Sequence, residues 1–85
     1  MNLEMILKNV KSELERARRN YPSNEKLLAA FNEEAGELTK AFLDHHYEKT
    51  TDKKLVEEAI QVICVAVRLI EEGDSDFNFK GWGNL

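Results

Sequence analysis

Two short acidic clusters stand within segments that otherwise carry apolar side chains at helical spacing. The first occupies residues 33–37 with the order Glu-Glu-Ala-Gly-Glu, and the second occupies residues 57–61 with the order Glu-Glu-Ala-Ile-Gln. Burying an unpaired carboxylate is costly enough that such a group usually becomes protonated, forms an ion pair or binds a metal ion. The two clusters are therefore the candidate functional residues of this chain.

The first cluster borders an apolar helical face. At about 100° per residue, Glu34 lies beside that face, Glu37 lies at its margin, and Glu33 points further toward solvent. Four large side chains make the face, namely Leu27, Phe31, Leu38 and Phe42. We therefore expect Glu34 to face inward, with the small side chains of Ala30 and Ala41 leaving room for a ligand beside Glu37.

The second cluster forms a polar stripe on an otherwise apolar helix. Glu58 and Gln61 are three residues apart and share a face with Glu57 and Arg68. The connection between the two acidic helices, residues 47–52, is short and favours antiparallel neighbours. The two clusters then meet at similar height, so that four oxygen-bearing side chains converge.

Converging carboxylate and amide oxygens suit Mg²⁺, or alternatively Mn²⁺, because hard cations prefer oxygen ligands. A zinc site is not expected, because His45 and His46 have no further His or Cys at metal-binding spacing. The alternative is a purely structural role, since Glu is a strong helix former and pairs of Glu three residues apart are common on solvated helices. The functional interpretation depends on the two clusters meeting.

Helical periodicity and capping residues predict three helices that position these side chains. The first ends near Asn20, and Pro22 with Ser23 as an N-cap separates it from a second helix over residues 24–47. The third begins at the capping cluster of residues 50–52, continues to Glu71 or Glu72 and is closed by Gly73. The β-branched side chains of residues 60–67 also suit a buried strand, but about twenty continuous residues fit a helix better.

The fold class predicted is all-α, a bundle of about three helices per chain in one domain of 85 residues. From Ala59 to Ile70, ten of twelve residues are apolar, so the third helix must be covered on several sides. We therefore expect a second subunit to complete the bundle, as a homodimer or homotetramer. The tail, residues 73–85, is expected to be irregular and anchored by aromatic side chains that pack in the core or an interface, with stacking on the base of a ligand as the alternative. These side chains are Phe77, Phe79 and Trp82.

The amino-acid composition restricts the classes of partner that we expect this protein to bind. A formal charge of −4 and a pI near 5.2 argue against nucleic acid, and the basic run of residues 16–19 sits beside acidic residues as ordinary helix surface. The longest apolar run is too short to span a bilayer, and the start of the sequence does not resemble a signal peptide. The lone Cys64 is expected to pack as a small hydrophobic residue. We therefore expect a cytoplasmic protein without a membrane partner.

The acidic pattern resembles that of the MazG-like all-α nucleoside triphosphate pyrophosphohydrolases, a superfamily that includes dimeric dUTPases and phosphoribosyl-ATP pyrophosphohydrolase. Its signature is Glu-Glu-x-x-Glu on one helix and Glu-x-x-Asp on the next. Glu33, Glu34 and Glu37 match the first half, and the resemblance covers residues 24–72. In the second half, Glu58 matches, whereas Gln61 stands where the family has a carboxylate.

The resemblance implies that Glu34, Glu37 and Glu58 bind Mg²⁺ and are catalytic, with Gln61 at the fourth ligand position and Glu33 as an outer-shell or second-metal ligand. It implies hydrolysis of a nucleoside triphosphate to a nucleoside monophosphate and pyrophosphate. Lys54, Arg68 and Lys80 are possible phosphate contacts that the motif does not fix. Because Gln61 carries no charge, the alternative is a weakened or inactive module that binds a nucleotide or a protein.

Overall fold

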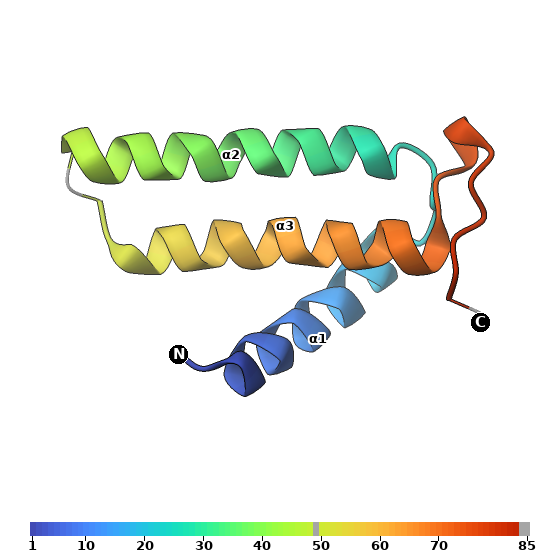
Figure 1. The fold of residues 1–85 in the computed structure, drawn as a ribbon, viewed down its shortest axis with the longest axis horizontal. Coiled ribbons are helices and arrows are strands. Elements are labelled where there is room, and N and C mark those ends of the chain that lie inside the picture. The colour runs from blue at the N-terminus through green and yellow to red at the C-terminus, as the bar shows by residue number, and fades with distance from the viewer. Residues whose placement is uncertain (49, 84–85) are drawn as a thin grey trace.

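The computed structural model describes residues 1–48 and 50–83, which form three long helices and one short one. The long helices are α1 (Leu3–Asn20), α2 (Leu27–Glu48) and α3 (Asp52–Glu72), and the short 3-10 helix is η1 (Ser75–Phe77). In Figure 1, α2 and α3 lie antiparallel along their lengths, and α1 crosses beneath α3 at an angle. The described residues contain no strand, so the all-α class is confirmed.

The ends of α1 and α3 agree with the sequence prediction. The α1 helix ends at Asn20, and α3 follows an N-cap at Thr51 and ends before Gly73. Gly73 has a positive φ of 74°, and its N–H donates to the Leu69 carbonyl at 3.0 Å. A side chain at this position would collide with the Phe79 carbonyl, so glycine is required both for the backbone conformation and for the close approach of the tail.

The start of α2 differs from the prediction, which placed it at residue 24 with Ser23 as the N-cap. Lys26 has a φ of 61°, a left-handed conformation that a right-handed helix cannot continue through, so α2 begins at Leu27. Instead of Ser23, Asp74 caps the helix, because its Oδ2 accepts from the Leu28 N–H at 2.8 Å. Asp74 is 2% exposed. A residue from the folded-back tail therefore fixes the first turn of α2.

The core lies between α1 and α3. It consists of the buried Val10, Leu14, Ile60 and Cys64, with Ile6 and Val67 packed against them. The Cys64 Sγ lies 3.6 Å from the Val10 carbonyl oxygen, and burial raises the pKa of this thiol to about 11. Cys64 therefore packs as a small hydrophobic residue, as predicted.

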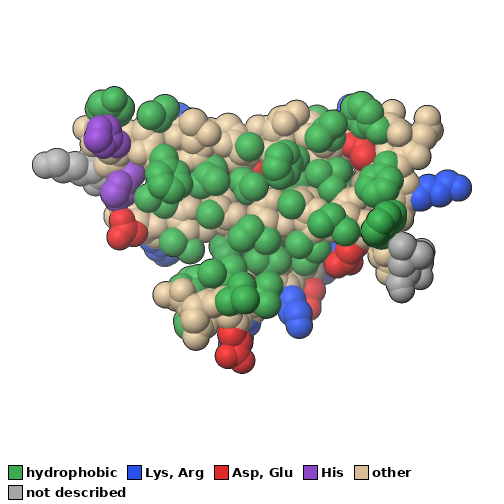
Figure 2. Space-filling model, in the orientation of Figure 1, with side chains coloured by type: hydrophobic (Ala, Val, Ile, Leu, Met, Phe, Trp, Pro, Cys, Tyr) green, Lys and Arg blue, Asp and Glu red, His purple; other side chains and the backbone are tan. Residues whose placement is uncertain are grey.

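Large apolar side chains stay exposed on every helix. Figure 2 shows apolar atoms running along the face formed by α2 and α3 and continuing onto α1. On α3, Ile70 is 61% exposed. Others with more than a third of their area exposed include Leu3, Leu7, Phe42, Leu43, Val56 and Ile63. One chain therefore covers α3 only in part, and its coverage by a second subunit stays a prediction.

The tail is held by its backbone. Asp74 and Phe79 exchange backbone hydrogen bonds, and the N–H groups of Trp82 and Gly83 donate to the carbonyls of Ile70 and Glu71. The side chains of Phe77, Phe79 and Trp82 are exposed, Trp82 at 67%, so the expectation that they anchor the tail in the core of this chain is wrong. Their packing in an interface stays a prediction.

A search of the described helices for a stretch of sufficient length and hydropathy to cross a membrane finds none.

Candidate functional site

All five residues predicted for the metal site line one pocket of about 800 Å³. From α2 come Glu33, Glu34 and Glu37, and from α3 come Glu58 and Gln61. We call this cavity the acidic pocket. The antiparallel arrangement of α2 and α3 brings both clusters to one pocket, as predicted, but the expected convergence of their oxygen-bearing side chains is not seen among the described residues. Whether they form a metal site stays a prediction.

Small side chains line part of the pocket on the α2 side. Ala29 and Ala30 both line it, as expected for Ala30. Ala41, which was expected to leave room beside Glu37, is instead buried and does not line the pocket. The room for a ligand therefore lies toward the beginning of α2.

Glu34 is the least compensated carboxylate of the pocket. It is half-buried, and its pKa is raised, first by loss of hydration and then by the negative charges of Glu58, Glu33 and Glu37. None of the ion pairs within residues 1–48 and 50–83 includes Glu33, Glu34 or Glu37. This part of the pocket therefore has negative charge that a bound cation would neutralise.

Glu58 is paired within its own helix. Its side chain is 12% exposed, and its Oε1 lies 2.8 Å from Nζ of Lys54 one turn earlier. The charge and hydrogen bonding of Glu58 raise the pKa of Lys54. Lys54 is therefore engaged by Glu58 and is not a free phosphate contact. The neighbouring Glu57 is exposed, lies 3.8 Å from Lys53 and lines another cavity.

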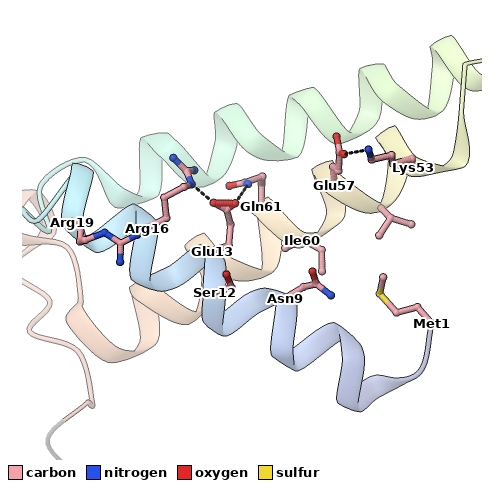
Figure 3. Close-up of a pocket in the computed structure, with 11 residues that line it drawn as sticks. Met1, Asn9, Ser12, Glu13, Arg16, Arg19, Lys53, Glu57, Ile60 and Gln61 are labelled. Carbon is pink, nitrogen blue, oxygen red and sulfur yellow. Dashed lines mark hydrogen bonds and ion pairs between the residues drawn. The ribbon is translucent and has the colours of Figure 1, made fainter.

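Gln61 is held by a residue that the sequence did not single out. Its Nε2 donates to Oε2 of Glu13 on α1 at 3.0 Å, and Glu13 also forms an ion pair with Arg16. Figure 3 shows the Glu13 carboxylate between Arg16 and Gln61. The sequence gives a signal only for the pair of Glu13 with Arg16, which are three residues apart on one helix. The contact with Gln61 spans 48 positions and requires the crossing of α1 over α3.

Arg68 has a structural role. It is 4% exposed, binds the Glu72 carboxylate through two nitrogens at 2.8 and 2.9 Å, and donates to the carbonyls of Tyr21 and Ser23. The Arg68 and Arg18 side chains hold the pKa of Glu72 below its usual range despite its partial burial. These contacts fasten the α1–α2 connection to α3, although Arg68 also lines the acidic pocket.

Besides the buried Arg68, the cations that line the acidic pocket are Arg16 and Lys26, both exposed. Neither was among the phosphate contacts considered from the sequence. The third of those, Lys80, is exposed on the tail and does not line the pocket. Arg16 and Lys26 are therefore further candidates for binding an anionic substrate, although Arg16 is paired with Glu13 as Lys54 is with Glu58.

A second cavity of about 590 Å³ lies between α1 and α3 (Figure 3). It shares Gln61 and Arg16 with the acidic pocket, and Glu13 also lines it. Among the residues that complete its wall are Met1, Asn9, Ser12, Arg19, Lys53, Val56 and Ile60. The hydrogen bond between Glu13 and Gln61 therefore lies at the boundary of the two cavities.

The oxygen donors of the acidic pocket suit Mg²⁺ or Mn²⁺ by their chemistry. In the described part of the chain, no three His, Cys, Asp or Glu side chains converge closely enough to hold an ion as they stand. The histidines contribute nothing here, since His45 pairs with Asp52 at 2.8 Å and His46 packs edge-on against Tyr47.

Comparisons with protein families, with curated proteins and with solved structures return no match to this chain.

Proposed function

We propose that the chain is a Mg²⁺-dependent nucleoside triphosphate pyrophosphohydrolase, which converts a nucleoside or deoxynucleoside triphosphate to the monophosphate and pyrophosphate. The observation that carries the proposal is the environment of Glu34. Its pKa is raised by burial and by three neighbouring carboxylates in one pocket. Such a concentration of charge destabilises a fold unless a ligand compensates it. The resemblance of the two clusters to the MazG-like signature supports this reaction.

The residues suited to hold the ion are Glu34 and Glu37 on α2 with Glu58 and the carbonyl of Gln61 on α3. An ion held there would neutralise charge on the phosphates and polarise the bond that breaks. Glu58 would exchange Lys54 for the ion, which is feasible because an ion pair between residues four apart contributes only about 0.3–0.5 kcal/mol.

The remaining residues of the pocket bind and orient the substrate. Arg16 and Lys26 lie at its edge and provide positive charge for the phosphates that are distant from the ion. Glu33 is exposed on the solvent side and accepts the proton of the attacking water. The water oxygen forms a bond to phosphorus as the bridging P–O bond breaks. If water attacks the α-phosphorus, pyrophosphate leaves with the bridging oxygen. If it attacks the β-phosphorus, pyrophosphate receives the oxygen of the water and the monophosphate keeps the bridging oxygen.

The proposal includes a homodimer or homotetramer. Its support is the exposed apolar surface along α2 and α3 (Figure 2), which a second chain would cover. Sedimentation equilibrium at low micromolar concentration tests this part. A mass of one chain throughout the concentration range would refute it without affecting the proposed chemistry.

The test of the reaction is pyrophosphate release from a panel of ribo- and deoxyribonucleoside triphosphates with Mg²⁺ or Mn²⁺. We expect turnover of at least one substrate, and we expect Glu34→Gln and Glu37→Gln to abolish it. Glu48→Gln is the matched control, because it removes the same charge from an exposed position of α2. Folded protein that releases no pyrophosphate from any member of the panel would reject the proposal.

A second candidate function is a module that binds a nucleotide without hydrolysing it. The observation that favours it is the amide of Gln61, which brings no charge to the fourth position. Titration calorimetry with nucleotide and metal separates the two functions, because binding without turnover supports the second. A purely structural bundle predicts neither binding nor any effect of substitutions at Glu34, Glu37 and Glu58.

A further inference from the structure

The exposed apolar side chains of α3 repeat every seven residues. Val56, Ile63 and Ile70 are 40%, 37% and 61% exposed, and the small Ala59 and Ala66 lie between them. At about 100° per residue, these positions fall within an arc of about 80° on one side of the helix. Such a repeat of β-branched residues, with a second apolar position in each interval, is the pattern by which helices pack lengthwise against each other. We call this arc the α3 seam.

The α2 helix carries a matching repeat, which we call the α2 seam. It consists of Leu28, Phe31, Ala35, Leu38 and Phe42. The two helices run antiparallel and are joined by a short connection (Figure 1). Counted back from that connection at 1.5 Å per residue, Phe42 lies at the level of Val56, and Leu28 lies at the level of Ile70. The two seams therefore run side by side, and together they form what we call the seam face.

The seam face is uncharged and lies opposite the acidic pocket. Within residues 28–42 and 56–70, every Asp, Glu, Lys and Arg falls outside the two seams. On α3, the pocket residues Glu58, Gln61 and Arg68 lie on the other side of the helix, and no seam residue lines the pocket. Because the chain has a formal charge of −4, an uncharged face is where two copies meet with the least repulsion.

We propose that two copies of this chain pair through the seam face, with α2 of each copy packed against α3 of the other in a four-helix bundle. This inference rests on the oligomeric part of the proposed function and is independent of the proposed hydrolysis. It leaves each acidic pocket on the outside of the dimer, lined by a single chain.

The two seams are complementary in size. Phe31 of α2 lies at the level of Ala66 of α3, and the same relation holds between Leu38 and Ala59. A two-fold axis parallel to the helices places α2 of one copy over α3 of the other at the same levels. Each large side chain then meets a small one, as in well-packed cores. Pairing α2 with α2 would instead place large side chains against large ones.

The seam face is also comparable in size to a dimer interface. From Leu28 to Phe42 it is about 21 Å long at 1.5 Å per residue, and two helices of about 10 Å diameter make it about 20 Å wide. Its flat projection is therefore about 400 Å², whereas a stable interface uses about 800 Å² per partner. The two seams supply at least half of this area, and the apolar surface that continues onto α1 (Figure 2) adds to it.

The first test is sedimentation equilibrium of the native chain, Phe42→Glu and Ile70→Glu. We expect the native chain to dimerise and both variants to have a dissociation constant at least about a hundredfold higher, because two-fold symmetry places two carboxylates in each apolar interface. Both positions are more than half exposed in the single chain, so the variants should stay folded. The matched control is Met5→Glu, which puts the same charge on a half-exposed position of α1 and should change the dissociation constant less than about twofold.

Two results of this test would overturn the inference. If both variants dimerise as tightly as the native chain, the seam face is not the interface, and the oligomeric part of the proposed function stands. If the native chain stays monomeric at every concentration, whatever else covers the face, the inference and the oligomeric part fail together. Neither result affects the proposed hydrolysis.

The second test shows which helices meet. Under mild oxidation, Ala35→Cys chains mixed with Ile63→Cys chains should form a disulfide between copies, because these positions face each other when α2 packs on α3. Each variant alone should give at least about tenfold less of the linked product, because its own cysteines are too far apart. The native Cys64 is 2% exposed and is not expected to react. Equal linking in either variant alone would overturn the pairing of α2 with α3.

Discussion

Replacing Glu34 by Gln is expected to stabilise the metal-free protein and to destabilise it relative to the native chain when metal is present. In the folded state, burial and the charges of Glu58, Glu33 and Glu37 raise the pKa of Glu34. A raised folded-state pKa means that folding disfavours the ionised carboxylate. The fold therefore loses stability as the pH rises through that pKa, and Gln removes this loss at pH 7.

The expected magnitude follows from the neighbours. A like-charged pair one helical turn apart, such as Glu34 and Glu37, costs about 0.2–0.5 kcal/mol, and Glu58 across the pocket adds a similar amount. Glu34→Gln should therefore raise the free energy of unfolding by about 0.5–1 kcal/mol, or the melting temperature by roughly 3–6 °C for a domain of this size. Mn²⁺ at about 100 times its Kd stabilises the native chain by about 2.7 kcal/mol, which exceeds that gain.

The assay is thermal unfolding of the native chain, Glu34→Gln and the control Glu48→Gln, each with a chelator and with excess Mn²⁺, at pH 7 and near pH 4. With chelator at pH 7, Glu34→Gln should be the most stable, and with Mn²⁺ the native chain should be. The gain should vanish near pH 4, where Glu34 becomes protonated in both states. A variant less stable than the native chain in chelator at pH 7 would refute the account of Glu34 as uncompensated.

Three further predictions concern residues other than Glu34. Asp74→Ala removes the carboxylate that caps α2 at Leu28, so urea denaturation should show a loss of about 2–3 kcal/mol, and a loss below 0.5 kcal/mol would contradict the cap. Lys54→Met releases Glu58 and removes a competing positive charge, so Mn²⁺ affinity measured by calorimetry should rise a few-fold rather than fall. Cys64 is buried with a pKa of about 11, so at pH 8 a thiol reagent should modify the native protein at least about a hundredfold more slowly than the urea-unfolded chain. Equal rates would show that Cys64 is accessible.

Local sequence signals predicted the helices well where each signal acts within one or two turns. Gly73 ends α3 because only glycine fits its backbone, and the apolar spacing of α1 places Val10 and Leu14 in the core. The start of α2 was predicted wrongly because its cap is not local. Asp74 lies 46 positions from Leu28, whose N–H donates to it. Ser23, although a good N-cap by residue type, accepts from the Glu25 N–H at 3.1 Å, before α2 begins.

In the candidate site too, features set by local sequence were predicted, and contacts between residues distant in sequence were not. The meeting of Glu34 with Glu58 followed from helical period and a short antiparallel connection, both legible in the sequence. The contact of Glu13 with Gln61 and the burial of Arg68 depend on how α1 crosses α3, which the hydrophobic pattern of α1 does not specify. Glu13 therefore looked like an ordinary charged helix position and Arg68 like a possible phosphate contact, and only the tertiary structure shows what they bind.

Two features of the described residues are unfavourable for a single chain without a ligand, and different partners would compensate them. Glu34 is half-buried among like charges, which a cation compensates and an apolar surface does not. Phe42 and Ile70 are largely exposed, which a second chain compensates and a cation does not. Because natural sequences tend to violate folding rules where function requires it, the two departures support a site and an interface as separate features of α2 and α3. Substitution of Glu34 should then change metal binding without changing the oligomeric state, and substitution of Ile70 by a charged residue should change the oligomeric state first.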